Sequence, residues 1–287
     1  MFRYSIIVFL AGFISLPAAA QQVLSENEAV AKALANNKNI QATSLQVKQQ
    51  QQLLKSAINL PNPDFFLESP TGKFYTGSIT QSFEFPTVYS NQYRLQKQQI
   101  AVAQKEKQLT EAELKYRVKV LYLEIQYADS LTNQLYIQDT LYEKIKLSAI
   151  RQFKAGQIDY LQQTFAETQY GEIHNQYQQS LIRAASLKAQ LQWFTGIKDS
   201  ISVEPLAVTI SQTLFSLAPD STALLSNPAV QLLQQQENVA KQNISLQKSK
   251  ALPGLAFGYF NQGERDTKWF NRFRVGVTIP LWFGQYK

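Results

Sequence analysis

A long run of this sequence, from Gln92 to Phe153, contains neither proline nor glycine. Leu, Lys, Gln, Glu and Ala, which all favour the helical state, dominate the run. At about 1.5 Å per residue, one continuous helix over this run would extend roughly 90 Å. A helix of that length does not fit inside one ordinary globular domain. The sequence therefore predicts a mainly α-helical protein with an extended architecture.

The apolar residues of this run form two stripes at spacings of three and four. The stripes differ by two residues, so they lie about 200° apart around the helix axis. Such a helix is expected to have a neighbour on each side, as in the wall of an α-barrel. A dimeric coiled coil, which needs only one stripe, is the alternative. The first stripe is Leu114, Val118, Leu121, Ile125 and Ala128, and the second is Tyr116, Val120, Leu123 and Tyr127.

One further helix is expected before the long helix, over residues 25–58, and another after it, over residues 159–194. Ser25 and Glu28 have the spacing of a capping box at the start of the first helix. Gly196 stands where the second should end, because glycine adopts the left-handed conformation of helix C-termini. Gly156 and Asp159 predict a turn between the long helix and the helix that follows it.

Two runs alternate between apolar and polar residues, as amphipathic β-strands do, over residues 77–86 and 273–280. Shorter partner runs are expected at 64–69 and 255–262. The length suits strands that cross a membrane, although a soluble hairpin with one buried face would show the same alternation. Four strands are too few to close a barrel, so membrane strands would have to come from several chains. The residues expected to face lipid are Ile79, Phe83, Phe85, Phe273, Val275, Val277 and Ile279.

An internal repeat organises the chain, because four landmarks recur in the same order at nearly constant spacing. The predicted division is a first repeat at 21–215, with a helix, two strands, a long helical hairpin and a linker, and a second at 216–287. The second repeat holds only a helix and two strands, so we expect a partial sequence. The matched pairs are 33–41 with 223–231, Pro61 with Pro253, 65–67 with 257–259, and Pro86 with Pro280.

Residues 1–20 are typical of a secretory signal peptide, with Arg3, an apolar run and three alanines before Gln21. An uncleaved membrane anchor is the alternative.

No cysteine occurs anywhere in the sequence, which excludes disulfides, thiolate zinc sites and cysteine nucleophiles. The net charge of +7 is spread along Gln-rich helices, so nucleic-acid binding is not expected. His174 is the only histidine and lacks a catalytic or metal-binding constellation, so we expect no enzyme activity, no cofactor and no metal site.

This layout resembles the TolC family of outer-membrane efflux proteins, especially the branch that works with metal- and drug-exporting resistance-nodulation-division pumps. The resemblance covers everything after residue 20. Its most telling segments are the hairpin end at 191–196, LQWFTG, and the turn at 153–159, FKAGQID. In that family each protomer is an internal repeat, and three protomers form a β-barrel pore above an α-helical tunnel.

The resemblance implies a TolC-like fold, with a long helical-hairpin α-barrel and a shared β-barrel, in a homotrimer of the outer membrane. It implies a passive exit duct for small molecules or metal ions, driven by an inner-membrane pump through a periplasmic adaptor. It also implies that most of the chain lies in the periplasm, and that the adaptor docks at Lys154, Ala155, Gly156, Gln157 and Ile158. The alternative is a periplasmic coiled-coil adaptor or scaffold.

Overall fold

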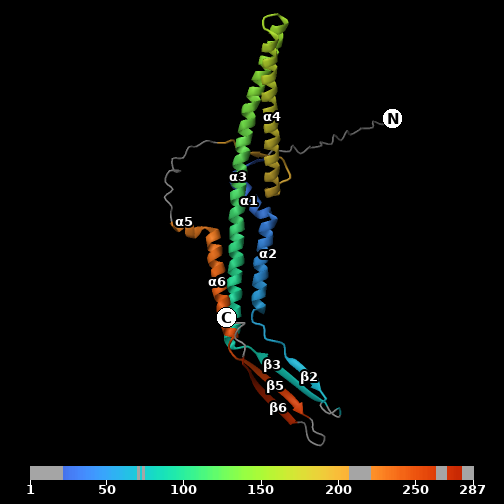
Figure 1. The fold of residues 1–287 in the computed structure, drawn as a ribbon, viewed down its shortest axis with the longest axis vertical. Helices are drawn as coiled ribbons and strands as arrows, with labels where there is room; N and C mark the ends of the chain where they lie inside the picture. The colour runs from blue at the N-terminus through green and yellow to red at the C-terminus, as the bar shows by residue number, and fades with distance from the viewer. Residues whose placement is uncertain (1–21, 70–71, 73–74, 207–220, 263–269, 280–287) are drawn as a thin grey trace, which may run out of the picture. The chain divides into compact units, whose positions relative to one another are not determined.

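The fold was obtained as a computed structural model, which describes residues 22–69, 72, 75–206, 221–262 and 270–279 (Figure 1). The expected signal peptide at residues 1–20 lies outside the described residues. The chain divides into two compact units, one at 1–33 with 118–208 and the other at 34–117 with 209–287. The long helix α3, Pro86–Lys154, contributes residues to both units.

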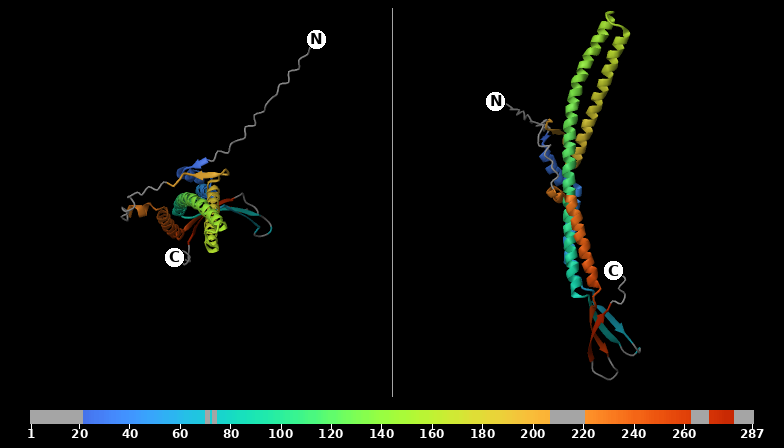
Figure 2. Two further views of the ribbon diagram at one scale, coloured as in Figure 1. Left: turned by 90° about the horizontal axis from the view of Figure 1, so that it is seen from above. Right: turned by 60° about the vertical axis from the view of Figure 1, so that its left-hand side comes forward.

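The first unit is a helical hairpin with a two-stranded sheet. The second part of α3 and the helix α4, Tyr160–Thr195, run side by side in opposite directions (Figure 2). The strands are β1, Gln22–Leu24, and β4, Ile201–Val203, which pair in parallel. Most of helix α1, Glu26–Asn36, also belongs to this unit.

The turn between α3 and α4 has the geometry that its sequence predicts. Gly156 has a φ of 69°. The backbone N–H groups of Gly156 and Gln157 donate to the carbonyls of Phe153 and Gln152, both at 2.9 Å, which ends α3. The carboxylate of Asp159 accepts from the backbone N–H of Gln162 at 2.7 Å and begins α4. The predicted end of α4 is also confirmed, since Gly196 has a φ of 70°.

The helix predicted over 25–58 is wrong in one respect, because it is interrupted at Asn37. The structure has two helices there, α1 and α2, Lys38–Leu53, followed by one 3₁₀ turn at Leu54–Ser56. Asn37 is extended, with φ −68° and ψ 127°. Its side-chain oxygen accepts hydrogen bonds from the backbone N–H groups of Asn39 at 2.9 Å and Ile40 at 3.4 Å. An asparagine that bonds to the backbone in this way starts a new helix. The capping box at Ser25 and Glu28 is confirmed.

The second unit contains a four-stranded antiparallel sheet in the order β2-β3-β5-β6. Its helices are α2, the first part of α3, α5 and α6. Helix α6 begins after Asn227, which caps it as Asn37 caps α2. Both predicted repeats therefore have their described elements in the same order, and the repeat itself stays a prediction. The bounds are β2 Asp64–Glu68, β3 Thr76–Phe83, β5 Gly254–Gln262, β6 Phe270–Thr278, α5 Ser221–Ser226 and α6 Pro228–Lys250.

Side-chain amides connect the helices of the second unit. Gln96 of α3 donates to the side-chain oxygen of Gln50 on α2 at 2.9 Å. On α6, Gln235 donates to the side-chain oxygen of Gln98 at 2.6 Å. Gln242 likewise donates to the side-chain oxygen of Asn91 at 3.1 Å. Helix α3 is therefore joined to two other helices of this unit by uncharged polar contacts.

The two predicted stripes of α3 have different surroundings. All five residues of the first stripe are buried, with exposed fractions of 0–6%. All four residues of the second stripe are exposed, with fractions of 37–70%. The chain therefore covers one apolar side of α3 and leaves the other apolar side uncovered.

Candidate functional site

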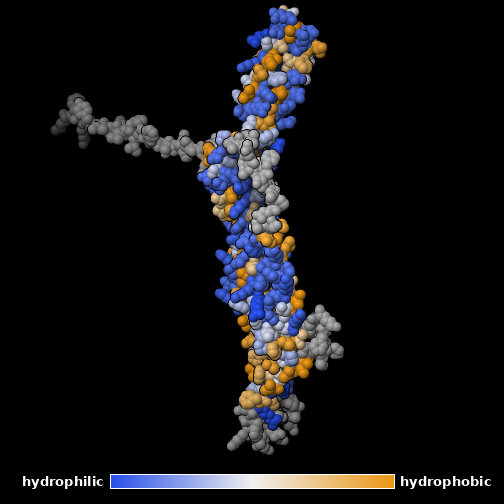
Figure 3. Space-filling view, turned by 90° about the vertical axis from the view of Figure 1, so that its left-hand side faces the viewer, coloured by the Kyte–Doolittle hydropathy of each residue, from blue (hydrophilic) through white to orange (hydrophobic). Residues whose placement is uncertain are grey.

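One face of the four-stranded sheet is apolar and exposed. Strand pairing places Phe65, Ile79, Tyr259 and Phe273 in one row across all four strands. The rows beside it hold Leu67, Phe257, Val275 and Val277. The exposed fraction reaches 72% at Phe65 and 81% at Phe273. In the space-filling view, apolar residues gather over these strands (Figure 3). An apolar face of this size points to an environment other than water.

The other face of the sheet carries small, polar and charged residues. Gly258 allows β5 to lie close to β3, because a Cβ there would be 3.2 Å from the Thr80 hydroxyl. Most of the remaining side chains of this face are hydroxyl or charged groups suited to contact with water, and Phe66, Ala256 and Phe260 are the apolar exceptions. They include Asp64, Phe66 and Glu68 on β2, Ser78, Thr80 and Ser82 on β3, Ala256 and Phe260 on β5, and Arg272, Arg274 and Thr278 on β6.

The pairing places five of the seven predicted lipid-facing residues on the same side of the sheet, namely Ile79, Phe83, Phe273, Val275 and Val277. Ile79, Phe273, Val275 and Val277 are exposed there, and Ile279 is exposed just after β6 ends. Phe83 is only half-exposed, since its ring lies edge-on to that of Phe257 with the centroids 5.8 Å apart. Their orientation toward lipid stays a prediction.

Phe85 lies outside the strand in which it was predicted. Strand β3 ends at Phe83, and Pro86 already begins α3 because proline fits the first helical position without losing a hydrogen bond. The sheet pairing therefore does not assign Phe85 to a face. Its exposed fraction is 36%, and it lines a hollow at the end of the strands.

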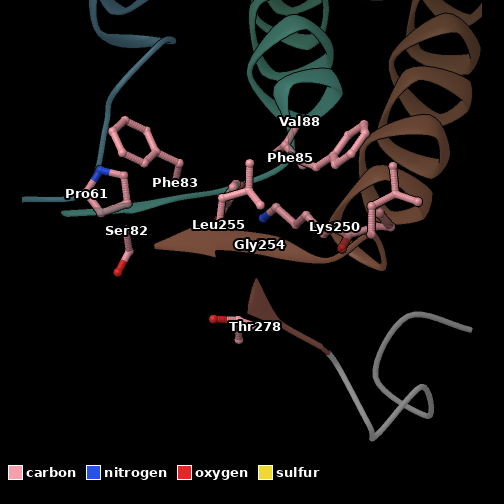
Figure 4. Close-up of a pocket in the computed structure, with 12 residues that line it drawn as sticks. Pro61, Ser82, Phe83, Phe85, Val88, Lys250, Gly254, Leu255 and Thr278 are labelled. Carbon is pink, nitrogen blue, oxygen red and sulfur yellow. The ribbon is translucent and has the colours of Figure 1, made fainter. Parts of the chain in front are cut away.

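This hollow has a volume of about 730 Å³ and lies where α3, α6 and the strands of the second unit meet (Figure 4). Aromatic and aliphatic side chains from β3, β5, the start of α3 and the residues just before α3 and β5 contribute to its wall. Glu84 and Lys250 contribute one charge of each sign. With both an acid and a base on its wall, the hollow shows no preference for an ion of either sign. The apolar residues on the wall are Phe83, Phe85, Val88, Leu252 and Leu255.

The predicted docking residues form the end of the α3–α4 hairpin. Lys154, Ala155, Gly156 and Gln157 are exposed, and Ile158 is half-exposed. Helix α3 ends with the basic residues Arg151 and Lys154. Exposed apolar residues follow directly on α4, with Leu161 at 75% and Phe165 at 65%. The structure brings the five predicted residues together on one accessible turn, and their docking role stays a prediction.

Sequence reasoning missed the contact that ties β1 and β4 to α3. The hydroxyl of Tyr122, which is 2% exposed, donates to the carbonyl of Leu24 at 2.8 Å and accepts from the backbone N–H of Glu204 at 3.1 Å. Burial raises the pKa of Tyr122 above its usual value of 10.0. A tyrosine on the buried side of a helix was the available signal, but its partners are distant in sequence.

His174 lies between the two helices of the hairpin. Its Nδ1 is 3.0 Å from a carboxylate oxygen of Asp139 on α3, and its ring stacks on that of Tyr170 at 5.4 Å. The ammonium of Lys146 lies 3.6 Å above the Tyr170 ring. These contacts hold α3 and α4 in register.

Within the described residues, no three or more His, Cys, Asp or Glu side chains gather in a way that could hold a metal ion. The described helices also include none with the length and hydropathy to span a bilayer.

Comparison with solved structures identifies the architecture. The chain superposes on the outer-membrane channel CmeC of Campylobacter jejuni with a TM-score of 0.71 over 91% of its length, at 16% identity. A membrane protein from Pseudomonas aeruginosa gives a TM-score of 0.73 over 90%, at 14% identity. The channel-forming protein CusC gives 0.69 over 90%, at 15% identity.

The chain has a TolC-like fold. The long hairpin and the four-stranded sheet correspond to the helical and strand regions of these TolC-like structures. The chain spans 63–67% of the length of these three TolC-like structures. Protein-family models and curated protein sequences give no match.

Proposed function

We propose that this chain is a subunit of an outer-membrane channel, a passive exit duct for small molecules or metal ions. The observation that carries the proposal is the sheet of the second unit. It has a continuous apolar, exposed face in a TolC-like fold. Lipid would cover that face, and the opposite face, with its hydroxyl and charged side chains, would line water.

The channel is a homotrimer in this proposal. Four strands cannot close a barrel, and an open sheet in lipid would leave the backbone groups of its edges without hydrogen bonds. Strands from several copies satisfy these edges. The exposed stripe of α3, with Tyr116, Val120, Leu123 and Tyr127, would pack on helices of a neighbouring copy in the α-barrel.

The hairpin end is the docking site for a periplasmic adaptor, which links the channel to an inner-membrane pump. The support is the exposure of Lys154–Gln157 and the apolar residues that follow on α4. Exposed apolar side chains beside a polar turn are suited to a partner protein. The pump would supply the energy, and the channel would provide the path.

Export begins with the predicted signal peptide at residues 1–20. The chain would then lie mainly in the periplasm, with its strands in the outer membrane. A passive conduit requires no catalytic residues, so the proposal includes no enzyme activity and no cofactor.

Membrane extraction tests the proposal against the alternative of a periplasmic scaffold. The complete chain, made in a Gram-negative host, should remain with the outer-membrane fraction after alkaline carbonate treatment. The double variant F273D/V275D introduces two carboxylates on the apolar face and should be released. The control carries a single carboxylate at an exposed helical site, Gln190→Asp, and should stay in the membrane. Release of the unmodified chain by carbonate would favour the scaffold.

The docking role is tested at the hairpin end. Gln157→Trp places a bulky side chain on the exposed turn without requiring a left-handed backbone, and it should reduce crosslinking to the periplasmic adaptor. Gln190→Trp, on an exposed position of α4 outside the turn, should leave crosslinking unchanged. Equal crosslinking of both variants would count against docking at this turn.

A further inference from the structure

The charged residues of the four-stranded sheet are confined to its two outer strands. Among the described strands, β2 pairs only with β3, and β6 pairs only with β5, so each has one free edge. Strands β3 and β5 contain no charged residue. Strand β2 carries Asp64 and Glu68, whereas β6 carries Arg272 and Arg274. The sheet therefore has one acidic edge, β2, and one basic edge, β6.

All four charges lie on the same face. Pairing across the sheet places Asp64 in line with Thr80, Gly258 and Arg274. Glu68 and Arg272 also lie on this face, because side chains alternate along each strand. All four residues are exposed, and Arg274 lies over the ring of Phe260 at 5.1 Å. The charges are thus placed to meet a strand added at either edge.

We propose that these opposite charges select how copies of this chain join: the basic edge β6 of one copy pairs with the acidic edge β2 of the next. The inference rests on the proposed function, in which copies share one closed sheet, and it adds which side chains favour the junction that such a ring requires. Strands β2 and β6 run in opposite directions, since three antiparallel pairings separate them. Joining β6 to β2 therefore continues the antiparallel order from copy to copy.

The spacing of the charges allows an acid to lie opposite an arginine in more than one register of the β6–β2 junction. Opposite residues of an antiparallel pair lie on the same face, so registers that keep the apolar face continuous differ by two residues. Four successive registers of this kind each place one acid directly opposite one arginine. The pairs are Asp64 with Arg272, Asp64 with Arg274, Glu68 with Arg272, and Glu68 with Arg274.

Joining like edges has the opposite result. A β2–β2 junction would place carboxylates opposite or diagonal to carboxylates, and a β6–β6 junction would do the same with guanidinium groups. Like charges directly opposite in a sheet are destabilising, and opposite charges are stabilising. Head-to-tail joining also repeats one kind of junction around a closed ring, whereas a like-edge junction relates only two copies by a two-fold axis and needs a second kind of junction to continue.

Cysteine crosslinking tests which edges meet, because the natural chain has no cysteine. One tagged chain carries Phe66→Cys on β2, and a second chain with a different tag carries Gly276→Cys on β6, where a side chain meets only ordinary contacts. After co-expression of the complete chains and treatment with a short bis-maleimide, the crosslinked product should contain both tags. Products that join two β2 cysteines or two β6 cysteines in equal amount would overturn the head-to-tail assignment.

Charge reversal tests the electrostatic selection. The variants D64R/E68R and R272E/R274E should each lower the yield of mixed-tag product about tenfold. A chain that carries all four substitutions should crosslink to itself as well as the unmodified chain does. It should crosslink poorly to an unmodified chain. This recovery also excludes misfolding as the cause of the single-edge losses. The control E237K/K241E reverses an exposed ion pair on α6 and should change nothing.

The outcomes separate the two proposals. If the unmodified edges give no crosslink between copies, both the shared sheet and the edge selection are wrong. If the unmodified edges crosslink and the charge reversals have no effect, the shared sheet stands and the electrostatic selection is wrong.

Discussion

The two apolar stripes of α3 are similar in composition and spacing, yet they differ in what covers them. Ile125, on the first stripe, is 0% exposed, whereas Leu123, on the second, is 55% exposed. The two residues are separated by a single position on one helix. Periodicity therefore predicts a neighbour on each side of the helix, and the structure shows which neighbour the chain itself provides. In the proposed trimer, the second stripe is covered by another copy.

The largest expected effect comes from breaking the first stripe. Ile125→Ala should lower the free energy of unfolding by about 2–5 kcal/mol, because it removes buried methyl groups and leaves a cavity. Urea denaturation followed by circular dichroism measures the change. Leu123→Ala is the matched control and should change stability by less than about 0.5 kcal/mol in the dissociated chain. Equal losses in both variants would mean that the stripes are equally buried.

The next effect concerns the hydroxyl that Tyr122 contributes beside the first stripe. Tyr122→Phe should cost about 1–3 kcal/mol, since the Leu24 carbonyl and the Glu204 N–H lose a buried partner. Tyr127→Phe, on the exposed stripe, should be nearly neutral in the same urea experiment.

The dependence of stability on alkaline pH provides a further test of the Tyr122 hydroxyl. Because the pKa of Tyr122 is raised in the folded chain, the contribution of its neutral hydroxyl is complete below pH 10 and is lost as the pH rises through the raised value. Stability should therefore fall more steeply above pH 10 in the natural chain than in Tyr122→Phe. Identical pH profiles would argue against a buried neutral hydroxyl.

A smaller effect is expected at the turn that brings α4 against α3. Gly156→Ala should cost about 1–2 kcal/mol, because alanine is strained at a φ of 69°. Gly171→Ala, inside α4 with open space around it, should instead stabilise the chain by about 0.5–1 kcal/mol. Thermal denaturation should therefore show stability changes of opposite sign for the two variants. That result would mean that the backbone conformation at the turn, and not the loss of a glycine as such, causes the destabilisation by Gly156→Ala.

The smallest effect on the separate chain belongs to the second stripe, and it tests the proposed trimer. Leu123→Gln should leave the unfolding free energy within about 0.5 kcal/mol of the natural value. It should, however, reduce association between copies, measured by sedimentation of the detergent-solubilised chain. Unchanged association would mean that this stripe contacts no second copy.

Much of the helical part could be predicted because its signals are local. The absence of proline and glycine extends α3, and Gly156 with Asp159 sets the turn. The break at Asn37 was missed, since an asparagine within a helical pattern changes the periodicity little and acts only through its own side-chain bond. The sheet of β1 and β4 was missed because three-residue parallel strands leave no local pattern.

The candidate sheet was predictable in part for the same reason. Alternation alone assigned Ile79 and Val275 to apolar faces, because side-chain direction is a property of each strand. It could not show that both belong to one continuous face, or that β2 and β6 form the edges. Those facts depend on pairing between distant residues, such as Ile79 with Tyr259.

The amide contacts of the second unit have a consequence for the conditions that it tolerates. Gln50, Gln96, Gln98 and Gln235 bond through groups that carry no charge and do not titrate. Dissolved salt weakens ion pairs between exposed charges by screening them, but it has little effect on hydrogen bonds between uncharged amides. In the proposed channel the helices that these bonds join lie in the periplasm, whose salt content and acidity follow those of the water outside the cell. Helices joined by glutamines would keep their alignment while that water changes from dilute to brackish or from acid to neutral.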